Sequence, residues 1–141
     1  MWKYFTSLAC GVALGIVLDR IIQYIKNNQQ LKYTKVLEDC FGEPMFTNTL
    51  SVSDVRDWSR AREDMLKTGH KIVVMRAIPD QLKELGKELN IGKGIDNYLI
   101  MAVVNEESKE IAESMLVKYE RLDDGLNDQL NKGNGSMVIE G

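Results

Sequence analysis

Residues that could carry catalysis are few in this chain. It has one histidine, His70, and two cysteines, Cys10 and Cys40. A Ser-His-Asp mechanism would have to use His70 alone as its base. The position of His70 after a predicted helix equally suits a structural imidazole beside the negative end of the helix dipole. So few histidines and cysteines also argue against a zinc site. We therefore expect no catalytic residue, no cofactor and no metal.

Two short motifs resemble ligand-binding sequences without matching them. A Gly-Lys-Gly sequence occupies residues 92–94, but its spacing from Gly86 does not fit the phosphate-binding G-x-x-x-x-G-K-[ST] loop, and no strand leads directly into it. Asp123, Asp124 and Asp128 form an acidic cluster of a kind seen in two-metal sites. The sequence has no second acidic cluster with the spacing of metal ligands to complete such a site. The carboxylates of Asp123 and Asp124 suit the positive end of a helix dipole. A turn and a helix start are the simpler predictions.

Residues 54–64 are the densest mixture of charged and aromatic side chains. Trp58, Arg60 and Arg62 belong to the residue types that are favoured at protein interfaces. Trp58 is also in helical phase with Val55, which favours a place in the core. The arginines fall on more than one face of the helix and have acidic neighbours to pair with. The candidate binding residues are Trp58, Arg60, Arg62 and His70, with a structural role as the alternative.

Charge is distributed unevenly along the chain. The net charge is −3, and residues 1–50 carry five Lys and Arg against four Asp and Glu. The remainder carries 13 basic and 17 acidic residues, which gives it a net charge of −4. Because binding to phosphates requires a positive field, this acidic part disfavours nucleic acid as a partner.

The longest apolar stretch lies at residues 5–25. Only residues 5–18 are free of charge, but counting through Asp19 and Arg20 gives 21 residues. As a helix they would extend about 31 Å at ~1.5 Å per residue, which matches a hydrocarbon core of ~30 Å. We therefore expect residues 1–26 to form an uncleaved single-pass membrane anchor. One alternative is a cleaved signal peptide, but the small residues that mark a cleavage site do not follow this apolar stretch. The other alternative is a buried or interfacial helix.

The flanking charges predict how this anchor is oriented. The carboxyl side offers Arg20, Lys26, Lys32 and Lys35, whereas the amino side offers Lys3. The positive-inside tendency then places the carboxyl-terminal part in the cytoplasm.

Small residues recur every four positions within the apolar stretch. Ser7, Gly11 and Gly15 would share one face of a helix, and Gly11 and Gly15 form a GxxxG motif. Such a face lets a second helix approach closely. It predicts a homo-oligomer held together by the membrane helix, although glycine is also common in membrane helices without that role.

The rest of the chain predicts an α+β fold. Residues 27–50 are expected to form a connector, with a short helix over 31–39 and a loop at 40–49, and residues 51–141 a cytoplasmic domain. Its predicted order is α-β-α-β-β-α-β, in which a capping box at Ser51 and Asp54 starts a helix over residues 52–68. Strands follow at 72–75, 98–104, 111–120 and 137–139, with helices from Pro79 and over 122–132. We expect a mainly antiparallel four-stranded sheet with its helices against one face.

These features together favour a membrane-tethered, non-enzymatic interaction or adaptor module with the bilayer and an unidentified protein as partners. One alternative is an oligomer acting within the bilayer through the small-residue face. Another is a small enzyme or ligand sensor, which would need a polar pocket holding His70, Arg76 or the 92–94 loop.

Overall fold

Two apolar runs in the second half of the chain form the centre of a β-sheet. The computed structural model describes residues 3–6, 11–28, 32–77 and 97–140. Strands β3 (His70–Arg76) and β4 (Tyr98–Asn105) pair antiparallel, and every residue of β4 from Tyr98 to Val104 is buried. Because β4 is apolar on both faces, it needs a cover on both.

The sheet has six strands in the order β1-β6-β3-β4-β5-β2. The remaining strands are β1 (Lys3–Thr6), β2 (Met45–Leu50), β5 (Glu110–Leu122) and β6 (Ser136–Glu140). The hairpin of β4 and β5 confirms its prediction. Four pairings are antiparallel and the pairing of β2 with β5 is parallel. The expected mainly antiparallel sheet of four strands is thus corrected to a mixed sheet of six.

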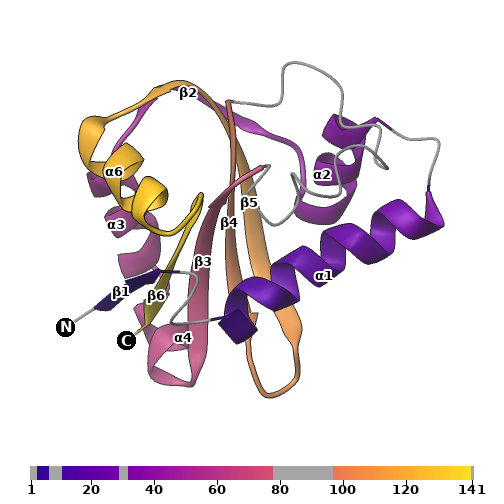
Figure 1. Cartoon of the computed structure of the whole chain (residues 1–141). Helices are drawn as coiled ribbons and strands as arrows, with labels where there is room; N and C mark the ends of the chain where they lie inside the picture. The colour runs from indigo at the N-terminus through magenta and orange to yellow at the C-terminus, as the bar shows by residue number, and fades with distance from the viewer. Residues whose placement is uncertain (1–2, 7–10, 29–31, 78–96, 141) are drawn as a thin grey trace.

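Helices cover both faces of this sheet (Figure 1). One face carries α1 (Gly11–Asn27) and α2 (Tyr33–Phe41). The other carries α3 (Val52–Arg60), α4 (Glu63–Lys67) and α6 (Asp124–Lys132). Alternate strand residues divide between the two cores, with Ile100 and Ala102 on the first and Leu99 and Met101 on the second. The prediction that helices lie against one face is therefore wrong.

The apolar stretch near the amino end differs most from expectation. Residues Lys3–Thr6 form a strand instead of helix, and α1 has 17 residues. Ala13, Leu14, Val17 and Ile21 of α1 are buried against the sheet. Within the described parts of the chain, no helix combines the length and the apolar character needed to cross a membrane. The expected transmembrane helix over residues 1–26 is thus unsupported, and the buried-helix alternative agrees with the packing.

Residues expected to form a connector contribute two elements to the fold. The hydroxyl of Tyr33 in α2 donates to the carbonyl of Ala77 over 2.5 Å, which ties α2 to the end of β3. The hydroxyl of Tyr24 in α1 donates to the Asp39 carboxylate of α2, also over 2.5 Å. Helix α2 confirms most of the short helix expected over 31–39 and continues to Phe41. Strand β2 begins at Met45, so the loop predicted for 40–49 is correct only for residues 42–44.

The helix predicted over 52–68 is interrupted. Its start is confirmed, because the Asp54 amide donates to Ser51 Oγ and the Ser51 amide donates to the Asp54 carboxylate. The chain turns at Ala61 and Arg62, which separates α3 from α4. The helix predicted from Pro79 and the 92–94 loop lie outside the described residues.

Candidate functional site

Trp58 and Arg62, two of the predicted binding residues, contact each other through a cation–π interaction. The Arg62 guanidinium carbon lies 3.7 Å from the centroid of the Trp58 ring. Arg62 also forms two hydrogen bonds of 2.7 Å with the carboxylate of Glu113 on β5. Trp58 packs partly buried against the core of α3, α4 and α6. This cluster clamps the end of α3 to β5, so it is a structural contact.

The other predicted residues are not drawn into that cluster. Arg60 is exposed at the end of α3. His70 is half-buried at the start of β3, where its Nδ1 lies 3.2 Å from Thr68 Oγ1. Ser7 lies outside the described residues, and Gly11 is the first residue of α1. Gly15 is exposed, and a Cβ built there would meet nothing within 4 Å. The fold itself therefore does not require glycine at position 15.

Asp123 of the acidic cluster and Arg76 have structural partners. Asp123 caps α6, because its carboxylate accepts a 2.8 Å hydrogen bond from the Leu126 amide. Among the described residues, no group of three His, Cys, Asp or Glu is placed to hold a metal ion. The Nη2 atom of Arg76 donates to the side-chain oxygens of Asn127 and Asn131 in α6. Arg76 thereby ties the end of β3 to α6.

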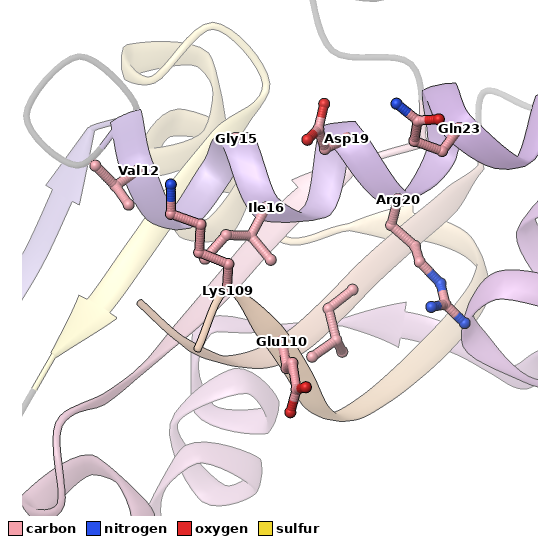
Figure 2. A pocket seen from close by; sticks show the side chains of 9 residues that line it. Val12, Gly15, Ile16, Asp19, Arg20, Gln23, Lys109 and Glu110 are labelled. Carbon is pink, nitrogen blue, oxygen red and sulfur yellow. The ribbon is translucent and has the colours of Figure 1, made fainter. Parts of the chain in front are cut away.

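A groove of about 830 Å³ runs between α1 and the turn that joins β4 to β5 (Figure 2). Its apolar lining includes Ile16 and Ile111. Lys109 extends from the turn toward α1, whereas Asp19 points away from the turn. The other lining residues are Val12, Gly15, Arg20, Gln23 and Glu110. This groove has the size of a small-molecule site, for which ~300–1,000 Å³ is usual.

The β2 edge is the second candidate surface. Within the described chain, the large hydrophobic side chains classed as exposed are Phe46, Val12 and Met45, at 71%, 55% and 49%. Two of these three, Met45 and Phe46, are consecutive residues of β2, which is an edge strand of the sheet. No residue of β2 is charged.

The backbone of β2 has a row of groups facing outward. The amide of Asp123 donates to the carbonyl of Leu50, which fixes the Leu50 carbonyl toward β5. In a strand, the N–H and C=O of alternate residues point to opposite sides. Met45, Thr47 and Thr49 therefore present theirs at the open edge, where the Thr49 carbonyl accepts a 3.5 Å hydrogen bond from the Thr47 hydroxyl.

A row of three neighbouring side chains extends from the β2 edge across β5 to β4. Phe46, Lys118 and Tyr98 stand opposite one another on β2, β5 and β4. The Lys118 Nζ lies 5.7 Å from the centroid of the Phe46 ring and 5.6 Å from that of Tyr98. A hollow of about 260 Å³ adjoins the row and includes Asn48 and Asn97. Sequence analysis missed this surface, although two adjacent large apolar residues in an uncharged run were a signal for it.

Comparison with protein-family models, with curated proteins and with solved structures finds no significant match to this chain. Function is therefore argued from the geometry of these surfaces.

Proposed function

We propose that the protein is an interaction module that binds an extended polypeptide segment as an additional strand beyond β2. The observation that carries this proposal is the β2 edge, where Met45 and Phe46 are exposed beside outward-facing backbone groups. In strand addition the main chain supplies affinity and alternate side chains supply specificity. Phe46 and the hollow beside it offer contacts of the second kind.

The other edge of the sheet fits this role less well. Strand β1 has four residues, whereas β2 has six, none of which is charged. Charged side chains and short length are the usual devices that keep an edge from pairing with other chains. An incoming strand is thus better accommodated at β2.

Ligand binding in the α1 groove is the second candidate. It is favoured by the groove volume of about 830 Å³ and by the charges of both signs that line it. A leucine introduced at Gly15 would fill part of the groove without meeting the core, because a Cβ there has nothing within 4 Å. If a metabolite library raises the melting temperature of wild-type protein but not of Gly15→Leu, the groove is a ligand site.

A bilayer location stays a prediction that rests on the sequence of residues 1–26. Flotation of the full chain with vesicles, before and after a wash with carbonate, tests it directly. If the protein is recovered only in the dense fraction, the predicted bilayer location is wrong. This result would not affect the proposal for β2.

Selection from a library of random linear peptides tests strand addition. We expect the selected peptides to protect the Thr47 and Thr49 amides from hydrogen exchange. Thr47→Pro removes an outward-facing N–H that β5 does not use, and should abolish binding. The matched control is Thr47→Ala, which keeps the N–H and should bind like the wild type. Peptides that bind both variants equally, or leave these amides unprotected, would show that β2 is not the binding edge.

A further inference from the structure

The β2 edge has the properties of a strand that can pair with a copy of itself. Its six residues, Met45–Leu50, carry no charge, so two copies meet without like charges opposite each other. Edges that must stay single are normally protected by such charges. The nearest lysine, Lys118, lies one strand further in.

Hydrophobic burial selects the register of such a pair. A two-fold axis at Phe46 places the two Phe46 side chains directly opposite each other on one face of the sheet. The axis also places Met45 opposite Thr47 of the second copy. Both exposed apolar residues of β2 then become covered at once, and register follows the apolar pattern wherever one is available.

The backbone is compatible with this register. Met45 and Thr47 carry their N–H and C=O at the open edge, as deduced from the Leu50 carbonyl. They would therefore form the hydrogen-bonded pairs, and Phe46 would form the closer, non-hydrogen-bonded pair between them. Aromatic side chains in such opposite positions stabilise a sheet. An axis at Asn48 would instead place Met45 opposite Ser51, whose amide is already used by Asp54.

We infer that two copies of this chain associate through antiparallel β2 strands, with Phe46 on the two-fold axis. The inference rests on the proposed strand addition at β2 and names a second copy as its partner. The two sheets become one continuous sheet across the interface. The two Lys118 side chains remain three strand spacings apart, about 14 Å, which exceeds the Debye length of ~8 Å at physiological salt.

Sedimentation equilibrium of the full chain tests the association. We expect a concentration-dependent dimer in the wild type. Each copy of Thr47→Pro removes one hydrogen bond across the interface, so the dissociation constant should rise about tenfold or more, because a net hydrogen bond contributes ~0.5–1.5 kcal/mol. Thr47→Ala is the matched control and should dimerise like the wild type.

Cysteine cross-linking tests the register. In the inferred pair, residue 46 faces its own copy, whereas residue 48 is displaced from its copy by several residues. Phe46→Cys should therefore form an intermolecular disulfide under mild oxidation, and Asn48→Cys should not. Wild-type protein shows how much cross-linking arises from Cys10 and Cys40.

The outcomes separate this inference from the function on which it rests. A wild-type monomer that still binds linear peptides at β2 overturns the inference and keeps the proposed function. A monomer that binds no peptide there overturns both. A dimer that cross-links at Asn48→Cys, or at neither position, also overturns the inferred interface.

Discussion

Two aromatic–cation pairs on this protein have opposite surroundings. Arg62 lies over Trp58 at 3.7 Å and is also held by Glu113 through two hydrogen bonds. Lys118 lies 5.7 Å from Phe46, and Phe46 itself is 71% exposed at the sheet edge. The first pair completes its contacts within the chain. In the second pair, the Phe46 ring is exposed at the sheet edge, beside the outward-facing backbone groups of β2.

This difference shows why residue type alone is a weak guide to binding. Trp and Arg are enriched at interfaces, and that enrichment pointed to Trp58 and Arg62. Enrichment says nothing about whether the fold already satisfies those side chains. The exposed candidate surface lies instead at Phe46, in a segment with no charged residue.

The largest expected effect separates the two aromatic residues. Trp58→Ala should lower the free energy of unfolding by about 3 kcal/mol, because truncating a packed aromatic leaves a cavity. At concentrations low enough for the protein to be monomeric, Phe46→Ala should change it by less than ~0.5 kcal/mol, as is usual at exposed positions. Urea denaturation followed by circular dichroism measures both values. Equal losses for the two variants would break the comparison.

A smaller effect is expected for the ion pair beside Trp58. A double-mutant cycle with Arg62→Ala and Glu113→Ala should give a coupling energy of about 1 kcal/mol. Bidentate geometry raises this value above that of an ordinary surface pair, while partial exposure limits it. The same cycle with Lys118→Ala and Phe46→Ala should give a smaller value. Chemical denaturation of the variants in each cycle supplies the energies.

A third prediction concerns the face of α1 that the fold leaves uncovered. Gly15→Ala should raise the free energy of unfolding by up to ~1 kcal/mol, because alanine is the better helix former and the added Cβ meets nothing. If the small-residue face of Gly11 and Gly15 instead holds two helices together, the same variant should weaken self-association. Thermal melting and sedimentation of Gly15→Ala distinguish these two results.

The smallest expected effect is a change in stability with pH, caused by the hydrogen bond between Tyr24 of α1 and Asp39 of α2. Hydrogen bonds from Tyr24 and Lys35 lower the pKa of Asp39 from its ordinary value of 3.8. A carboxyl whose pKa is lowered on folding contributes stability above its unfolded pKa and loses it as the pH falls through the folded pKa. Asp39→Asn should thus reduce stability at pH 7 and narrow the difference from the wild type below pH 3.8. Acid titration of the two proteins by circular dichroism, with Glu43→Gln as control, measures this.

Much of the sheet could be predicted from the sequence. The apolar runs predicted strands at β3, β4 and β6, and the alternation of residues predicted β5 and its hairpin with β4. The capping box at Ser51 predicted the start of α3. These are local signals, and each is set by neighbouring residues in the chain.

What failed depended on contacts between distant segments. The apolar face of α1 is equally compatible with lipid and with a sheet, and its sequence does not state which one covers it. Strand β2 has a weak apolar pattern, and its partner β5 lies more than 60 residues further along the chain. Met45 and Phe46 in an uncharged run were a local signal for a strand, but nothing local shows that this strand pairs with β5 and lies at the edge of the sheet.

The pairing of β1 with β6 has a consequence for how this protein reaches its final form. Strands β1 and β6 lie side by side, with Lys3 opposite Glu140 (Figure 1). During synthesis, residues Lys3–Thr6 cannot find their partner until Ser136–Glu140 have left the ribosome. Closing contacts between such distant segments is slow, and an unpaired strand is prone to aggregation meanwhile. Strand β1 is thus secured only after β6 has been made, although it precedes every other described element in the sequence.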